Sequence, residues 1–411
     1  MFVRRTAAVL AATTVIGAVL APAALAADSS PSPSTAIPSG LYGSTDPTYD
    51  GVWRQSLALL AQDTAGVRPA AKAVDWLTGQ QCANGAFAAF RADASAACDA
   101  KTQVDTNSTA AAVQALAALG GHDDATGRAV TWLRSAQNKD GGWGYMAGGP
   151  SDTNSTSVVI GALHAVGKKP QSVSKDGKSP YDALLKLSMP CKGDGGGAFA
   201  YQPDKKGGLA ANADATAAGV TAGMGQGFVA QTGYTNALTG CVAPETPNRA
   251  DAAGNGANYL AGALAKTSYL KSSLPGADDQ PDYGNTADAV VALSSIGATK
   301  EAKKPLAWLE KNSAAWAAKS GPAAYAQLIF AAHSTGTDPR DFGGQDLVAK
   351  LNATGPAPST AGASATPSEK KDDQQKDDDG GLGVWWIVGV GLVAGVGIGF
   401  LISGRNKNRQ L

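Results

Sequence analysis

The chain has 411 residues, of which 44% are hydrophobic and 17% are charged. Its 34 basic side chains equal its 34 acidic ones, so no net field attracts nucleic acid or an anionic surface, and we expect no nucleic-acid partner. The 51 glycines and the many alanines are typical of close-packed helices joined by Gly-rich turns.

Residues 1–26 predict a secretory signal peptide. Arg4 and Arg5 precede an uncharged apolar stretch at residues 7–20, which is followed by the small-residue triplet Ala24, Leu25 and Ala26. This apolar stretch is too short for a convincing permanent membrane span. We therefore expect cleavage before Ala27, followed by a disordered N-terminal segment at residues 27–39.

Residues 40–351 contain internal repeats. The segments KAVDWLTGQQCANGAF (72–87) and RAVTWLRSAQNKDGGW (128–143) share a long pattern that chance does not explain. In each, the Ala, Val, Trp and Leu positions form one apolar stripe that predicts a helix, which includes Trp76 or Trp132. The glycine that follows marks the end of this helix.

A second helix follows each of these segments. It begins DTNST at Asp105 and again at Asp152, where the aspartate is a typical N-cap before an Ala-, Val- and Leu-rich body. Weaker copies begin near Asp46, Asn212 and Asp282, and further helices are expected at 181–189, 257–264, 305–311 and 323–333. The period is roughly fifty residues, and the number of helix pairs approaches six.

The chain has four cysteines, Cys82, Cys98, Cys191 and Cys241. An even number in an exported domain predicts two disulfides, and three pairings are possible. We favour Cys82 with Cys98 and Cys191 with Cys241, because each pair closes a loop between consecutive helices. A zinc site is the weaker reading, since the chain has no Cys-x-x-Cys and no nearby histidine pair, and we expect no metal and no cofactor.

The C-terminal end predicts a membrane anchor. Residues 352–381 are rich in Pro, Ala, Ser, Lys and Asp and predict a disordered stalk. Residues 382–403 are long and apolar enough for a transmembrane helix, and the basic tail at 404–411 is expected to be cytoplasmic. The sequence thus predicts a single-pass cell-membrane protein with an extracellular N-terminal domain.

The two clear repeats resemble the QW motif of the terpenoid cyclase and prenyltransferase-like superfamily. The resemblance spans residues 40–340 and is strong from 70 to 165. It implies an all-α fold, an (α/α)6 toroid of repeated helix pairs, to which the C-terminal transmembrane helix is added. It also implies that Gln81, Phe87, Gln137 and Trp143 are structural residues of the repeat.

The chemistry of that superfamily is not matched by the residues present. Its alkene- or epoxide-protonating cyclases use Asp-x-Asp-Asp-Thr, where the repeats here have Asn107-Ser108 and Asn154-Ser155 and where Asp214 stands alone. The zinc ligands of protein prenyltransferases and the Gly-Cys-Gly-Glu-Gln of thioester domains are absent too. Vertebrate cobalamin carriers are similar in build, because their inner helices begin with Asp-Thr and small residues.

We therefore hypothesise a non-catalytic binding module, for a corrinoid or another bulky amphipathic ligand. Its polar mouth would consist of helix beginnings and two loop tyrosines: Asp105, Asn107, Ser108, Asp152, Asn154, Ser155, Asn212, Asp214, Asp282, Asn285, Tyr145 and Tyr201. Each polar residue could instead be only a helix cap. The alternatives are a divergent terpenoid cyclase or prenyltransferase-like enzyme and a protein-interaction scaffold. Expected partners are a corrinoid or terpenoid-like molecule, the membrane, and a membrane transporter or cell-surface protein.

Overall fold

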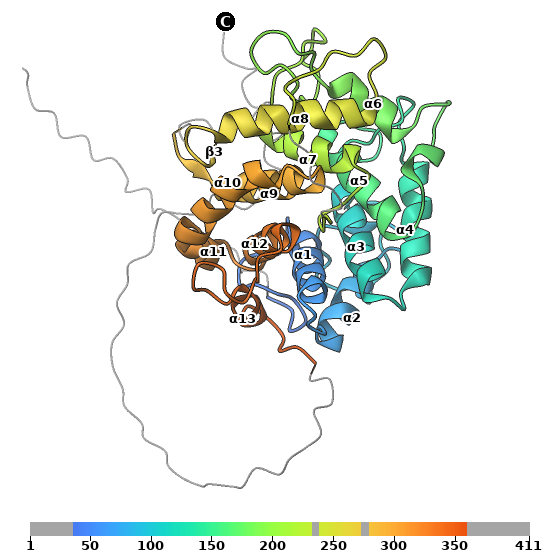
Figure 1. Cartoon of the computed structure of the whole chain (residues 1–411). Coiled ribbons are helices and arrows are strands. Elements are labelled where there is room, and N and C mark those ends of the chain that lie inside the picture. The colour runs from blue at the N-terminus through green and yellow to red at the C-terminus, as the bar shows by residue number, and fades with distance from the viewer. Residues whose placement is uncertain (1–35, 232–237, 273–278, 360–411) are drawn as a thin grey trace, which may run out of the picture. The chain divides into compact units, whose positions relative to one another are not determined.

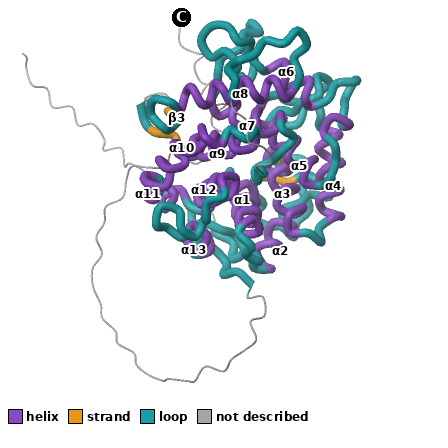
Figure 2. The backbone as a smooth tube through the Cα atoms, in the orientation of Figure 1, coloured by secondary structure: helices purple, strands orange, loops and turns teal. Residues whose placement is uncertain are grey.

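The computed structural model describes residues 36–231, 238–272 and 279–359 (Figure 1). The expected signal peptide, transmembrane helix and cytoplasmic tail lie outside these ranges. Among the described residues, no helix combines the length and the apolar character that a membrane crossing needs. Apart from two short strand pairings, the described chain consists of helices and loops (Figure 2).

Six helices form a closed inner ring. They are α1 (Gly51–Thr64), α3 (Thr106–Leu119), α5 (Thr153–Ala165), α7 (Ala213–Gly223), α9 (Tyr283–Ser295) and α12 (Pro322–Thr335). Each of them packs against the next in this order, and α12 packs against α1. The ring therefore closes with six members, as the repeat pattern predicts.

The remaining helices cover the ring from outside. They are α2 (Ala71–Gly79) on α1, α4 (Asp123–Ser135) on α3, α6 (Pro180–Leu187) on α5, α8 (Arg249–Leu264) on α7, α10 (Thr299–Asn312) on α9, and both α11 (Ala314–Ser320) and α13 (Leu347–Asn352) on α12. A short 3-10 helix, η1, spans Pro170–Ser172. In α3 every residue from Thr106 to Leu116 is buried, whereas α4 buries one stripe. Small alanines suit the inner position because helices surround it on several sides.

Two short antiparallel strand pairs lie just before inner helices. β1 (Phe87–Ala88) pairs with β2 (Val104–Asp105), with Phe87 opposite Asp105. β3 (Leu270–Lys271) pairs with β4 (Pro281–Asp282), with Leu270 opposite Asp282. Each pairing brings the loop that follows an outer helix back to the beginning of the next inner helix.

A repeated hydrogen-bond strap joins neighbouring inner helices. A threonine hydroxyl in the first turn accepts from a loop N–H in four repeats: Thr109 from Phe87 (2.9 Å), Thr156 from Trp143 (3.1 Å), Thr216 from Phe199 (2.9 Å) and Thr286 from Leu270 (3.0 Å). In the same loops, the residue two positions after this N–H donor accepts a hydrogen bond through its backbone carbonyl. The donor is a backbone N–H at the beginning of the preceding inner helix: Val52 donates to Ala89 (2.8 Å), Thr106 to Tyr145 (2.9 Å) and Thr153 to Tyr201 (3.0 Å). The straps hold successive inner-helix beginnings side by side.

The repeated glutamines tie consecutive outer segments together. The amide of Gln81 donates to the carbonyl of Ala125 in α4 at 2.8 Å. The amide of Gln137 donates to Val173, just before α6, at 3.4 Å. Trp143 is 1% exposed, and its indole N–H donates to Leu133 of α4. These contacts join outer segments to one another, and none of them involves the first turn of an inner helix.

Both disulfide pairings favoured from the sequence are confirmed. Cys82 is bonded to Cys98 and Cys191 to Cys241, so the described chain has no free cysteine. They close loops with sequence separations of 16 and 50 residues. The longer loop joins the segment after α6 to the segment before α8, and so it restrains the chain on both sides of α7.

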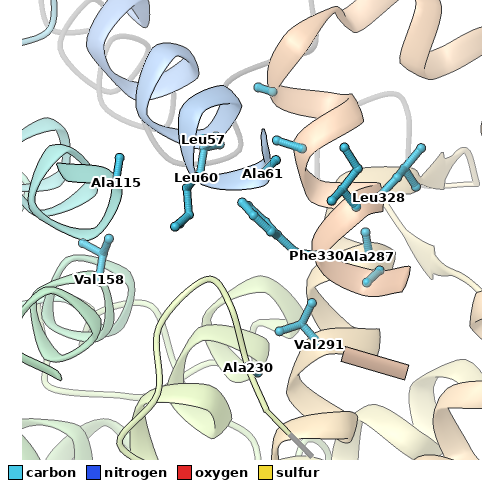
Figure 3. Close-up of a cluster of buried hydrophobic side chains, with 14 of the residues drawn as sticks. Leu57, Leu60, Ala61, Ala115, Val158, Ala230, Ala287, Val291, Leu328 and Phe330 are labelled. Atoms are coloured by element: carbon cyan, nitrogen blue, oxygen red, sulfur yellow. The ribbon is translucent and has the colours of Figure 1, made fainter. Parts of the chain in front are cut away.

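A loop of the protein's own chain reaches into the interior of the ring. The loop at residues 224–231, here called the plug loop, follows α7 and contacts other members of the ring. Its Phe228 lies edge-on to Trp53 of α1 at 5.4 Å and parallel to Phe330 of α12 at 6.4 Å. The Phe228 N–H donates to Gln114 of α3 at 3.0 Å. Figure 3 shows Phe330 beside Leu60 in this buried cluster, with Ala230 of the plug loop below them.

The packed fold extends beyond residue 351, where the sequence analysis ends the helical domain. Gln62 donates to the side chain of Asn352 at 2.6 Å, and the buried Tyr42 hydroxyl donates to Pro356 at 2.8 Å. The N–H of Ser359 donates to Arg68 at 3.0 Å. The first part of the expected stalk is therefore packed against α1 and the segment before α2. Composition did not reveal this, because the contacts at Pro356 and Ser359 use main-chain groups that any residue provides.

Candidate functional site

The beginnings of α3, α5, α7 and α9 share one rim of the ring, because the straps hold those of α3, α5 and α7 beside one another and α9 packs against α7. We define the rim as residues 105–109, 152–156, 212–216 and 282–286 together with Tyr145 and Tyr201. It contains all twelve residues that the sequence analysis assigned to a polar mouth. Of the four large apolar side chains that are exposed in the described chain, Met146 directly follows Tyr145 of the rim, and Tyr49 directly precedes the N-cap of α1, the inner helix next to α3.

Four rim residues are used as helix caps. A side-chain oxygen of each accepts from the backbone N–H three residues later: Asp105 from Ser108 (2.6 Å), Asp152 from Ser155 (2.6 Å), Asn212 from Ala215 (2.8 Å) and Asp282 from Asn285 (3.0 Å). The amide of Asn285 also donates to Asp282 at 2.8 Å. For these residues capping accounts for at least one oxygen of the side chain.

The rim also concentrates buried polar atoms that have no hydrogen-bond partner within the protein. Asn107 is 2% exposed, and neither its amide nitrogen nor its oxygen has a partner. The same holds for single atoms of five neighbours: Thr106 Oγ1, Asp152 Oδ2, Asn154 Oδ1, Ser155 Oγ and Ser157 Oγ. Seven of the eleven such atoms in the described chain thus belong to the beginnings of α3 and α5. Each orphaned atom costs about 1–3 kcal/mol, so a structural role alone does not explain the group.

Two carboxyl groups with strongly raised pKa values face the rim. Burial, with smaller effects of Asp282 and Asp152, raises the pKa of Asp214 to about 7, although the Asn154 amide donates to it at 2.6 Å. Burial and the charge of Asp214 raise the pKa of Asp288 in α9 to about 8, although Gln327 of α12 donates to it at 3.0 Å. Asp214 is the lone acid of its sequence segment, and the packing of α9 against α7 brings Asp288 near it in space.

The rim tyrosines lie beside carboxyl groups. Burial, and then the charge of Asp105, raises the pKa of the Tyr145 hydroxyl. Burial, and then Asp152 and Asp214, raises the pKa of the Tyr201 hydroxyl. Both hydroxyls stay protonated at neutral pH and can donate a hydrogen bond.

Asp288 and Gln327 were missed in the sequence analysis, although Asp288 left a signal. It lies two residues after Thr286, and the corresponding positions after Thr109, Thr156 and Thr216 are Ala111, Val158 and Ala218. An acid where three other inner helices have an apolar residue marks a buried charge. Within the described residues, no group of three His, Cys, Asp or Glu side chains has the arrangement of a metal site.

Comparison with known proteins finds only distant structural similarity. No protein-family model and no curated protein match the chain. Solved structures that it resembles include the ent-copalyl diphosphate synthase from Streptomyces platensis (16% identity, TM-score 0.46) and a type II terpene cyclase from Scytonema in complex with geranylgeranyl dihydroxybenzoate (15%, 0.42). A third is a protein from Actinoplanes (14%, 0.32).

These matches cover 70%, 70% and 68% of this chain and 50%, 78% and 100% of the respective partners. The chain thus spans half the length of the ent-copalyl diphosphate synthase. All three identities lie between 14% and 16%.

Proposed function

We propose that the protein is a ligand-binding toroid whose site is the rim, a divergent member of the terpenoid cyclase-like superfamily that holds a molecule rather than converting it. The observation that carries this proposal is the cluster of orphaned polar atoms at the beginnings of α3 and α5. A ligand that hydrogen-bonds to Asn107 and Asn154 would offset their desolvation cost. The neighbouring Tyr49 and Met146 add apolar surface, which suits a bulky amphipathic molecule.

The plug loop supports binding at the rim rather than inside the ring. Phe228 contacts both Trp53 and Phe330, where an apolar substrate chain would need space. At Gly161 of α5 there is no room for a side chain, because a Cβ would lie 2.7 Å from the Cα of Gly227 in the plug loop.

The proposal includes export and membrane anchoring, on the strength of the signal peptide and apolar segment that the sequence predicts. Two disulfides support a location outside the cytoplasm, since disulfides persist in oxidising compartments. A binding ring held above a membrane would present its ligand to a transporter or another cell-surface protein. A corrinoid and a terpenoid-like molecule are the two ligands to test first.

Native mass spectrometry of the protein purified from its own host tests this function. We expect a small molecule to stay with the wild-type protein and to be lost from Asn107→Leu, which removes both orphaned amide atoms at nearly constant volume. The matched control is Ser294→Ala, because Ser294 Oγ is also buried and orphaned but lies in the last turn of α9. Retention by Asn107→Leu, or a wild-type protein that carries no molecule, would contradict rim binding.

An acid-catalysed enzyme is the second candidate, and the pair of Asp214 and Asp288 favours it. A carboxylic acid that is still protonated near pH 7 can act as a general acid. In this case the retained molecule would be converted during incubation, and Asp288→Asn would prevent the conversion. Recovery of the molecule unchanged from the wild-type protein, by the same mass measurement, excludes this candidate for that molecule.

A further inference from the structure

We propose that the rim ligand carries an organic cation, an ammonium or guanidinium group that lies against Asp214 and Asp288. This inference rests on the proposed binding function and names the chemical class of its ligand. It depends on three properties of the rim: the sign of its charges, the kind of atom left without a partner, and the aromatic ring beside them.

Acidic side chains without basic partners face this part of the rim. Asp152 caps α5, Asp282 caps α9, and Asp214 and Asp288 lie in α7 and α9. The charged groups that act on Asp214 are Asp282 and Asp152, and those that act on Asp288 are Asp214 and Asp282. None of them is basic. Within the described residues the two ion pairs, Arg54 with Asp50 and Lys271 with Asp279, involve none of these four carboxyl groups.

The charged groups on the elements packed around α7 and α9 are engaged elsewhere. On α8, Arg249 donates to the Gly223 carbonyl at the far end of α7, and Asp251 takes part in capping its own helix. On α6, Asp182 caps its own helix. On α10, the lysines Lys300, Lys303, Lys304 and Lys311 are exposed, and Glu301 is in the first turn. On α12, His333 is in the last turn. A cation at the rim therefore meets no competing positive side chain.

The orphaned atom of Asn154, beside the pair, is a hydrogen-bond acceptor. Asn154 is 7% exposed; its amide nitrogen already donates to Asp214, and its Oδ1 has no partner. The carboxyl of Asp152 is fully buried and already interacts with Ser155 and Tyr145. A ligand that satisfies Asn154 Oδ1 must donate a hydrogen bond, which ammonium and guanidinium groups do and an anion does not.

Helix beginnings usually favour anions, because their free N–H groups and dipoles are positive. Here the caps Asp152, Asn212 and Asp282 already occupy these N–H groups. The positive ends of the α5, α7 and α9 dipoles thus interact with side chains of the protein itself. The other charged groups at this part of the rim are carboxyl groups. Tyr201, which senses the charges of Asp152 and Asp214, adds an aromatic ring that can contact a cation.

Titration calorimetry of the full chain with benzylammonium, and with benzyl alcohol as its neutral counterpart, tests the inference. We expect benzylammonium to bind at least about tenfold more tightly at pH 8 than at pH 6, because the carboxyl groups must lose protons first. Comparison of two buffers with different ionisation enthalpies would show proton release at pH 7. Benzyl alcohol should bind at least about tenfold more weakly at pH 8, since it cannot pair with a carboxylate.

Substitutions test whether Asp214 and Asp288 bind the cation. Asp214→Asn and Asp288→Asn should each weaken benzylammonium binding at least about tenfold, whereas Asp63→Asn, which alters a carboxyl at the other end of α1, should not change it. Proton release by the wild-type protein does not depend on how the variants fold. Equal binding of both probes, no binding of either, or binding without proton release would overturn the cation assignment. The rim-binding function would stand in each case if the native molecule is still lost from Asn107→Leu.

Discussion

The side-chain amide of Asn154 in α5 donates to Asp214 Oδ2 in α7 at 2.6 Å, across the boundary between two neighbouring inner helices. The two residues occupy the same register, two positions after the caps Asp152 and Asn212. The repeat therefore supplies a donor in one copy and an acceptor in the next. The rest of the Asn154 amide, its Oδ1, is left for another partner.

Loss of this amide should raise the pKa of Asp214 further. Asn154→Ala removes the hydrogen bond that opposes burial, so the protonated form gains relative to the carboxylate. A 13C NMR titration of the aspartate carboxyl groups measures the shift directly. Asn285→Ala is the control, because Asn285 donates to Asp282 instead. An Asp214 pKa that falls, or that stays at about 7, would show that Asn154 has no such effect.

Stability should fall as the pH rises from about 4 to about 8. The pKa values of Asp214 and Asp288 are about 7 and about 8 in the folded protein, well above the value of an unfolded aspartate, so the folded state holds more protons in this window. By linkage the contribution is complete below the unfolded pKa and is lost as the pH passes the folded pKa. The buried caps Asp105 and Asp152, each with a pKa of about 6, act in the same direction.

Thermal unfolding at pH 5 and pH 8.5 checks this prediction. The wild-type protein should melt at a higher temperature at pH 5, and the difference should shrink in Asp288→Asn, which cannot ionise. A higher melting temperature at pH 8.5, or an unchanged difference in Asp288→Asn, would mean that the carboxyl pair is not protonated in the folded protein.

The threonine straps should stabilise the ring. Thr216→Val keeps the shape of the side chain but removes the hydroxyl that accepts from Phe199 and donates to Asn212. The buried Phe199 N–H is then left unpaired, which costs about 1–3 kcal/mol of unfolding free energy. Urea denaturation measures the loss. Thr131→Val in α4, whose hydroxyl is exposed, should change stability by no more than about 0.5 kcal/mol, and equal effects at both sites would refute the strap.

The plug loop should be displaced by one added methyl group. In Gly161→Ala the new Cβ would lie 2.7 Å from the Cα of Gly227 and about as close to the Gln114 amide, so the loop backbone must move. Overpacking of this kind costs about 1–3 kcal/mol. Fluorescence of Trp53, which contacts Phe228, reports the movement. Gly262→Ala in α8 meets nothing within 4 Å and is the control; an equally small effect at Gly161 would place the loop outside the ring.

Local signals predicted most of the scaffold. The DTNST beginnings at Asp105 and Asp152 predicted capped inner helices, and the Trp stripes of the preceding segments predicted outer ones, because caps and stripes depend on nearby residues. The disulfide pairing followed from the same loop order. The N-terminal and membrane segments predicted from composition lie outside the described residues and stay predictions.

The site was predicted less completely, because it is assembled by ring closure. Asp288 meets Asp214 only because α7 and α9 are neighbours, and Gln327 reaches Asp288 from α12, the last member of the ring. Phe228 is 114 residues from Gln114, its hydrogen-bond partner. Helix period and caps contain no information on such long-range pairs. The polar mouth stays a prediction, and neither the acid pair nor the plug loop was predicted.

A crystal structure of the protein purified from its own host tests the central proposal most directly, through the electron density beside Asn107 and Asn154. Rim binding predicts density for an organic molecule within hydrogen-bond distance of both side-chain amides. Density for isolated water molecules alone, each satisfying one of the orphaned atoms, would contradict a ligand site at the rim.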